Sequence, residues 1–214
     1  MAIKAILFDF DGTIADTHDA FLEIVNRLSR EFGYPRVDRQ EVERLKTLSS
    51  ADIIRYAQIS PFKIPFLLKR LKKELGRKIA TLKPYCDIKE ALILLKQKGY
   101  TLGIVTSNNK DNVSIFLQSN NLADFFDFVC AGTTLFGKNR IINRVLKEYD
   151  WQTEEVIYIG DETRDISAAK KSRLTMISVG WGFSSPVILQ AYHPDFLIYH
   201  PRELMTAITA VDTR

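Results

Sequence analysis

The sequence has little of several features that would indicate a special environment or partner. It contains only two cysteines, Cys86 and Cys130, whose separation fits neither a disulfide framework nor a metal-binding motif. No stretch approaches the roughly 18 consecutive apolar residues of a membrane span. The apolar run at the N-terminus is broken by Asp9 and is too short for the apolar region of a signal peptide. We therefore expect a cytoplasmic protein that does not enter a membrane.

The charge balance is also modest, with 30 Lys and Arg against 26 Asp and Glu and a net charge of +4. The sequence lacks the basic stripe with interleaved aromatic residues that indicates nucleic-acid binding. A mild positive balance instead suits a protein that handles small anionic molecules. With 214 residues, of which 46% are hydrophobic, the chain can form one large domain or one domain with an insert. The composition leaves the oligomeric state open.

Short apolar runs recur along the chain, and most are followed by turn residues and a helical pattern. The runs lie at residues 5–10, 100–106, 127–132, 155–161, 174–180 and 195–199. Most are rich in Val and Ile and do not alternate cleanly, which is typical of parallel strands buried on both faces. Helical patterns occur at residues 87–98, 110–121, 139–149, 164–172 and 201–211. This alternation predicts an α/β fold with a doubly wound parallel sheet.

Residues 17–82 interrupt the alternation and contain no convincing strand. Apolar residues recur there at helical spacing, at Phe21, Val25, Leu28 and Phe32 and again at Ile64, Leu68, Leu71 and Leu75. We expect an all-helical insert after the first strand, with residues 1–16 and 83–214 forming the α/β core. Asp16 and Asp19 are expected in the first turn of its first helix. The basic run at residues 69–78 is typical of a solvated helix face, with steering of anionic substrates as the alternative.

Polar side chains follow the predicted strands at the edge where parallel α/β sheets bind ligands, beyond the carboxyl ends of the strands. They are Asp9 and Asp11 after the first strand, Thr106, Ser107 and Asn108 after the second, Lys138 after the third, and Asp161 and Asp165 after the fourth.

The residue types at this edge predict a site for a divalent cation and a phosphoryl group. Asp9 and Asp11 are two positions apart and so point to the same side of an extended backbone. With Asp161 they provide the oxygen-rich ligand set that Mg²⁺ prefers. Lys138 adds a positive charge, and the Thr106 hydroxyl adds a donor for phosphoryl oxygens. One carboxylate can then be a nucleophile, while a second protonates the leaving oxygen and activates water.

Four segments, in this order, resemble the motifs of the haloacid dehalogenase superfamily: DFDGT at 9–13, IVTSN at 104–108, Lys138, and GDETRD at 160–165. The resemblance covers essentially the whole chain and is closest to phosphoglycolate-phosphatase-like members. It implies a Rossmann-like core, and the helical insert lies where that superfamily has its C1 cap.

The resemblance also implies a role for each motif residue. Asp9 would be the nucleophile and a Mg²⁺ ligand. Asp11 would be the general acid/base and a ligand through its backbone carbonyl, and Asp161 would be a further ligand. Asp165 would lie outside the ligand set and orient Lys138 or a metal-bound water, with a simple helix N-terminal acid as the alternative.

The remaining motif residues would bind substrate. Thr106 would hold the phosphoryl group with the amide of Ser107, and whether Thr106 or Ser107 makes the main contact stays open. Asn108 would lie beside them, and Lys138 would neutralise phosphoryl and nucleophile charge. Lys46, from the insert, is a further candidate for substrate contact.

Asp11 also separates branches of the superfamily, because dehalogenases lack it and phosphonate hydrolases replace it with a small residue. We therefore expect a Mg²⁺-dependent phosphatase that hydrolyses a small phosphate monoester, phosphoglycolate-like or a sugar phosphate, through an aspartyl-phosphate. A phosphomutase is one alternative, but LKTLSS at 45–50 has Ser50 where that branch has Arg. A phospho-accepting signalling domain and a catalytically silent interaction protein are the others.

Overall fold

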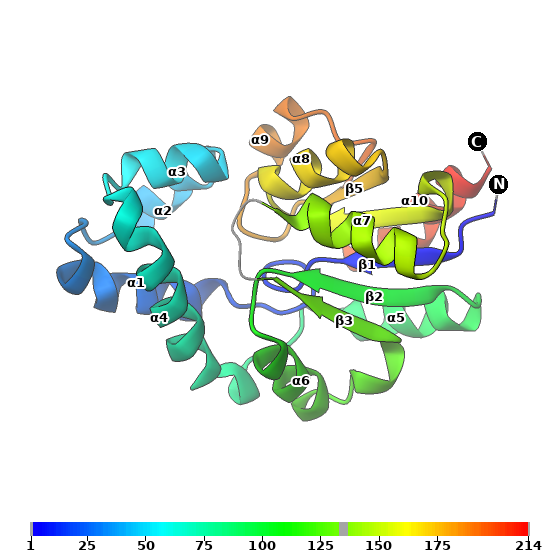
Figure 1. Cartoon of the computed structure of the whole chain (residues 1–214), viewed down its shortest axis with the longest axis horizontal. Coiled ribbons are helices and arrows are strands. Elements are labelled where there is room, and N and C mark those ends of the chain that lie inside the picture. Colours follow the sequence, from blue (N-terminus) through cyan, green and yellow to red (C-terminus); the bar gives the residue numbers. More distant parts are fainter. Residues whose placement is uncertain (1, 133–136, 214) are drawn as a thin grey trace.

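A computed structural model describes residues 2–132 and 137–213. Its centre is a six-stranded sheet with the order β3-β2-β1-β4-β5-β6, in which every neighbouring pair is parallel (Figure 1). The strands are β1 (Ala5–Phe8), β2 (Thr101–Thr106), β3 (Phe128–Ala131), β4 (Val156–Gly160), β5 (Thr175–Val179) and β6 (Phe196–Ile198). The chain builds the sheet outward from β1 first to one side and then to the other. The predicted doubly wound α/β fold is confirmed.

Successive side chains of the strands point to opposite faces of the sheet, and helices cover both faces. On one face Ile6 and Phe8 pack with apolar residues of α5 (Ile88–Gln97), α6 (Lys110–Ser119) and α10 (Leu204–Asp212). On the other, Ala5 and Leu7 pack with α7 (Lys138–Glu148), α8 (Thr163–Ser172) and α9 (Pro186–Ala191). Burial on both faces explains why these strands lack a polar-apolar alternation.

The strand β1 is shorter than the predicted run at residues 5–10, because the backbone turns after Phe8. The Asp9 amide still donates to the Ile159 carbonyl at 2.8 Å, which continues the ladder for one residue. The Phe10 carbonyl then accepts from the amides of residues 13, 14 and 15. This tight turn leaves Asp9 at the carboxyl end of the central strand.

Residues 17–82, between β1 and α5, are largely helical. They contain α1 (His18–Phe32), α2 (Arg39–Leu45), α3 (Ser50–Tyr56) and α4 (Ile64–Gly76), with 3₁₀ turns at Pro61–Lys63 and Ile79–Thr81. Residues 17–82 are all described and include no strand. Figure 1 shows these helices gathered beside the carboxyl edge of the sheet, on the side away from the two termini. We call residues 17–82 the helical insert.

The helical insert is joined to the core by two chain segments that lie side by side. The Asp16 amide donates to the Lys83 carbonyl at 3.0 Å, and Ala15 forms a β-bridge with Pro84. Asp19 lies in the first turn of α1 as expected, but the prediction for Asp16 is wrong. Asp16 precedes the helix, because its backbone is engaged in this pairing.

A buried carboxylate ties α1 to α4 within the insert. Glu74, 3% exposed, accepts from Arg27 of α1 at 2.6 Å and from Arg70 and Arg77 at 3.2 and 2.8 Å. Several partners are needed because an unpaired buried charge is costly. Across residues 2–132 and 137–213, no helix combines the length and the apolar character needed to cross a membrane.

Candidate active site

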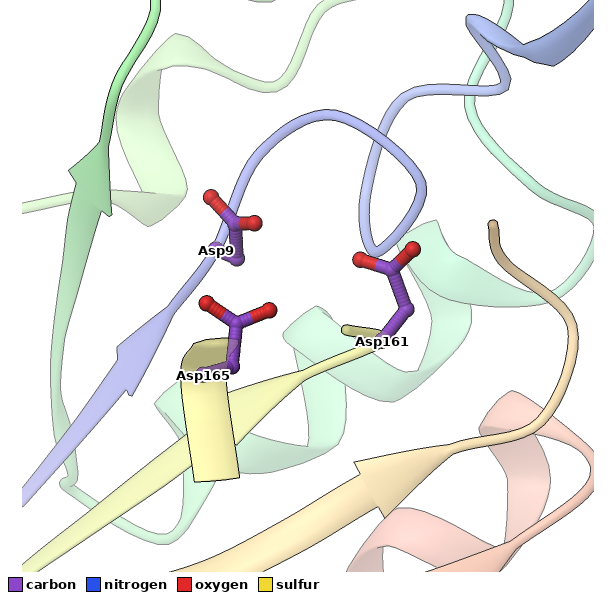
Figure 2. Close-up of side chains that lie close together, drawn as sticks. All are labelled: Asp9, Asp161 and Asp165. Atoms are coloured by element: carbon purple, nitrogen blue, oxygen red, sulfur yellow. The ribbon is translucent and has the colours of Figure 1, made fainter. Parts of the chain in front are cut away.

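Three buried carboxylates from separate segments meet at the carboxyl edge of the sheet. Asp9 follows β1, Asp161 follows β4, and Asp165 lies in the first turn of α8. Each offers an oxygen, and these oxygens all lie within 4.8 Å of one another. Figure 2 shows the three side chains converging on one space beneath the loop that follows β1. From the sequence we expected Asp9 and Asp161 to be ligands of one cation and Asp165 to lie outside the ligand set. In the structure Asp165 is a member of the carboxylate cluster.

Lys138, the first residue of α7, supplies the positive charge at this cluster. Its Nζ lies 2.6 Å from Asp9 Oδ2 and 2.6 Å from Asp165 Oδ1, and all three side chains are at most 2% exposed. The predicted contact between Asp165 and Lys138 is therefore present. Part of the loop that precedes Lys138, AGTTLFG, lies outside the described residues.

The charges of this cluster do not balance among the described side chains. Three buried carboxylates face one ammonium group, which leaves two negative charges when all are ionised. Burial raises the pKa of Asp9 to about 7 despite the nearby Lys138. Burial, with the charges of Glu162 and Asp9, raises the pKa of Asp161 well above its ordinary range. A cation placed between carboxylates lowers their pKa values and so opposes these shifts.

The donor set fits a hard divalent cation. Asp9 Oδ2 is buried and accepts no hydrogen bond of good geometry from the described residues, although it forms the ion pair with Lys138. Carboxylate oxygens are the ligands that Mg²⁺ prefers, and two positive charges would neutralise the excess at the cluster.

Asp161 is held in place by the loop after β1 and by the segment after β5. Thr13 Oγ1 donates to its Oδ1 at 2.8 Å, and the Phe183 amide donates to its Oδ2 at 2.7 Å. Gly12 has a φ of +82°, and a Cβ at that position would lie 2.2 Å from Asp161 Oδ2. The glycine of the DFDGT motif is therefore required both by the turn and by this close approach.

Asp11 lies beside the carboxylate cluster rather than within it. Its two oxygens accept from Asn108 Nδ2 at 3.2 and 2.9 Å. Burial raises the pKa of Asp11, and the hydrogen bond from Asn108 opposes this shift. A carboxyl group with a raised pKa retains a proton more readily at neutral pH and is suited to general acid chemistry.

The three polar residues after β2 have different surroundings. Thr106 is fully buried, and its Oγ1 accepts from the Asn108 amide at 2.9 Å, which leaves its own O–H free to donate. Ser107 Oγ accepts from Arg164 Nη1 at 3.5 Å. Asn108 Oδ1 accepts from Asn112 Nδ2, which also donates to the Lys72 carbonyl of α4 at 3.0 Å. Asn108 thus connects Asp11 to the helical insert.

Lys46 lies at a large cavity rather than at the carboxylate cluster. Its Nζ pairs with Glu43 at 3.0 Å, and its carbonyl accepts from the Ser185 amide at 2.8 Å, which links the insert to the core. Asp11, Ser107 and Lys46 all line this cavity. The structure therefore brings Lys46 to the same space as Asp11.

Two basic residues of the site were not identified from the sequence. Arg164 lies inside the GDETRD motif, forms an ion pair with Glu162, and lines the same cavity as Asp11. Because Arg164 is a residue of that motif, the motif could have identified it as a member of the site. Lys72 belongs to the basic run at 69–78 but lines the cavity, where burial lowers its pKa. Helical phase distinguishes Lys72 from its exposed neighbour Lys73.

The comparisons with known proteins agree with this fold. The family model described as haloacid dehalogenase-like hydrolase matches residues 6–179. A phosphoglycolate phosphatase of Synechococcus elongatus is 36% identical over 207 residues, covering 97% of this chain and 98% of the relative. A pyrophosphatase, PpaX, of Bacillus cereus is 25% identical over 220 residues, covering 98% of each chain.

Among solved structures, a predicted phosphatase from Clostridium acetobutylicum has a TM-score of 0.85 at 22% sequence identity, covering 98% of this chain and 100% of that one. At this identity the likeness concerns the fold alone. Because the family model spans most of the chain and a relative exceeds 30% identity over nearly all of it, the chain belongs to the haloacid dehalogenase-like hydrolases. It is therefore an enzyme of the hydrolase class.

Proposed function

We propose that this chain is a Mg²⁺-dependent phosphatase that hydrolyses a small phosphate monoester through an aspartyl-phosphate on Asp9. The observation that carries the proposal is the arrangement at the end of β1. Asp9 lies in the buried carboxylate cluster, while Asp11, two residues later, lies at the cavity with a raised pKa. The relative from Synechococcus elongatus supports a phosphatase, and phosphoglycolate is the first substrate to test.

Asp9 and Asp161 would hold the cation with the backbone carbonyl of Asp11, and Asp165 lies close enough to contribute. When bound, Mg²⁺ would neutralise the excess carboxylate charge and polarise the phosphoryl group. Lys138 would hold the Asp9 carboxylate in its ionised form and bind a phosphoryl oxygen. Thr106 would donate its hydroxyl to the same group.

The reaction would proceed in two displacements at phosphorus. In the first, an Asp9 oxygen bonds to phosphorus as the bond to the leaving oxygen breaks, and Asp11 gives that oxygen its proton. In the second, Asp11 takes a proton from a water whose oxygen attacks the phosphorus. The bond to Asp9 then breaks and inorganic phosphate is released. Asn108 would orient Asp11 in both steps through its hydrogen bonds.

We also propose that residues 17–82 act as a cap domain over this site, hinged near Asp16 and Lys83-Pro84. Ser50, at the start of α3, donates to Glu162 at 3.1 Å, and its amide donates to Thr163 at 3.2 Å. These contacts support closure of the insert on the core, which would exclude bulk water from the site. These hydrogen bonds also engage the Ser50 side chain. Because Ser50 has no guanidinium group to bind a second phosphate, its presence supports hydrolysis over phosphomutase activity.

Turnover of p-nitrophenyl phosphate, with and without Mg²⁺, tests the proposal. We expect hydrolysis that requires the divalent cation and is abolished in Asp9→Asn. In Asp11→Asn we expect a loss of about 10² to 10⁴ in steady-state rate, the range for a general acid/base. Asp124→Asn, at an exposed position, is the matched control. Absence of hydrolysis with any divalent cation would refute the phosphatase, and unchanged turnover in Asp9→Asn would refute the nucleophile.

A further inference from the structure

The helical insert encloses an apolar cavity that opens onto the site. The cavity has a volume of about 340 Å³, and most of its walls are aliphatic and aromatic side chains of the helical insert, including Val25, Ile54 and Leu68. Polar residues of the core, among them Asp11 and Asn108, line it where the insert meets the sheet. Figure 1 shows α1, α2, α3 and α4, the helices that contribute to these walls.

The size and the walls of this cavity can be compared with those of ligand sites. Cavities of roughly 300 to 1,000 Å³ with mainly apolar walls and a few polar groups are typical of small-molecule sites. The size and walls of this cavity therefore indicate a ligand.

Asp11 determines which part of the substrate enters the cavity. On the proposed function, Asp11 protonates the oxygen of the leaving alcohol, so that oxygen lies next to the Asp11 carboxyl group. Asp11 lines the cavity, whereas the buried Asp9 cluster that would hold the phosphoryl group does not. The carbon skeleton attached to the leaving oxygen therefore extends from Asp11 into the cavity.

The walls determine the chemistry of that skeleton. The cationic residues that line the cavity, Lys46, Lys72 and Arg164, can bind charge next to the phosphoryl group. Two tyrosines, Tyr34 and Tyr56, also line the cavity. The hydroxyl group of Tyr34 donates to the Val25 carbonyl at 2.7 Å, so its proton is already used within the protein. A skeleton with many hydroxyls or a distant charge would lose its hydration against these walls without replacement hydrogen bonds, which is unfavourable.

We propose that the substrate is a phosphate monoester of an alcohol with an apolar body, alkyl or aryl, which the cavity in the insert binds as the leaving group. This inference rests on the proposed phosphatase function and names the substrate class of the same site. It favours such esters over phosphoglycolate, whose short leaving group fills little of the cavity.

A series of n-alkyl phosphates from ethyl to octyl, compared with phosphoglycolate, tests the inference. We expect kcat/KM to rise by up to about fourfold per added methylene until the cavity is filled, the factor for full burial of a methylene group. The longer esters should exceed phosphoglycolate. A flat or falling series, with phosphoglycolate the better substrate, would overturn the inference.

Binding of n-alkylphosphonates, which cannot be hydrolysed to release an alcohol, separates the two proposals. We expect the dissociation constant to fall with chain length. If no ester is hydrolysed but the phosphonates follow this trend, the phosphatase function fails and the apolar cavity site stands. Equal affinity for methyl- and octylphosphonate would refute the cavity site whatever the activity.

Variants of the cavity wall provide a second test. Val25→Phe reduces the volume, and we expect it to lower the octyl-to-ethyl ratio of kcat/KM at least tenfold. Leu68→Ala enlarges the cavity and should shift the best substrate to a longer chain. Val187→Phe, at a position 76% exposed on α9, is the matched control and should leave the ratio unchanged. An unchanged ratio in both folded wall variants would overturn the inference.

Discussion

Replacing Asp161 by Asn is expected to stabilise the metal-free protein and to remove its response to Mg²⁺. The carboxylate is fully buried among Asp9, Asp165 and Glu162, whose charges with the burial raise its pKa well above the ordinary value. Ionised Asp161 is thus held in an unfavourable environment. The substitution removes one charge from a cluster with an excess of two negative charges.

The asparagine amide can satisfy the local hydrogen bonds. Its oxygen would accept from the Phe183 amide, and its NH₂ group would donate to Thr13 Oγ1, where the carboxylate now accepts from both. An uncompensated buried charge costs about 3–5 kcal/mol. The two bonds lose about 1 kcal/mol each when they no longer involve a charge. The net gain is about 1–3 kcal/mol, which at about 3 °C per kcal/mol for a chain of this size raises Tm by about 3–9 °C.

The stabilisation expected from Asp161→Asn depends on pH in a defined direction. Because the pKa of Asp161 is higher in the folded protein than in the unfolded chain, the folded state binds the proton more tightly. The free-energy cost of ionised Asp161 is absent below the pKa of this residue in the unfolded chain, near pH 4. The cost grows as the pH rises above that value. The difference in Tm between Asp161→Asn and wild type should therefore be close to zero near pH 4 and largest at pH 8.

Thermal unfolding in EDTA and in Mg²⁺ measures both effects, with Asp124→Asn at an exposed position as the control. Mg²⁺ at 100 times its dissociation constant should stabilise wild type by about 2.7 kcal/mol and the variant by much less. The reasoning is wrong if Asp161→Asn unfolds below wild type in EDTA at pH 8, or if it keeps the full response to Mg²⁺.

Two further substitutions test the surroundings of the cluster. Lys138→Met leaves the carboxylates without their ammonium partner and should destabilise the protein by about 3–5 kcal/mol in urea unfolding. The control Lys147→Met, at an exposed position, should change the free energy of unfolding by close to zero. Equal effects of the two substitutions would contradict the buried ion pair. Gly12→Ala and Gly99→Ala share a φ near +80°, but only a Cβ at Gly12 would meet Asp161 Oδ2. Calorimetric Mg²⁺ titration should therefore show binding weakened in Gly12→Ala and unchanged in Gly99→Ala, and equal affinities would refute this role of the glycine.

Much of the fold could be predicted from local pattern. The apolar run at residues 5–10 identified β1, and the spacing of Phe21, Val25, Leu28 and Phe32 identified α1. Boundaries were less secure, because they depend on where the backbone finds its hydrogen-bond partners. Asp16 looked like a first-turn helix residue, but its amide is paired with Lys83, which no local pattern could reveal.

Several members of the candidate site were predictable from the sequence, but Arg164, Lys72 and the geometry of the site were not. Asp9, Asp161 and Lys138 were selected because parallel strands end at one edge of a sheet, and the structure brings them together. Trp181 shows the limit of this reasoning. Its Nε1 donates to the Thr13 carbonyl at 3.1 Å, within the loop that holds Asp161, and this contact joins segments far apart in the chain.

The sequence by itself determined the sheet, the helical insert and the set of residues at the carboxyl edge, because periodicity and motif order are properties of the chain. Only the tertiary structure decided the remaining features. These are the entry of Asp165 into the carboxylate cluster, the separation of Asp11 from it, the turn of Lys72 towards the cavity, and the apolar space within the insert. Each depends on distances between segments far apart in the chain. Local residue patterns do not encode those distances, and packing sets them.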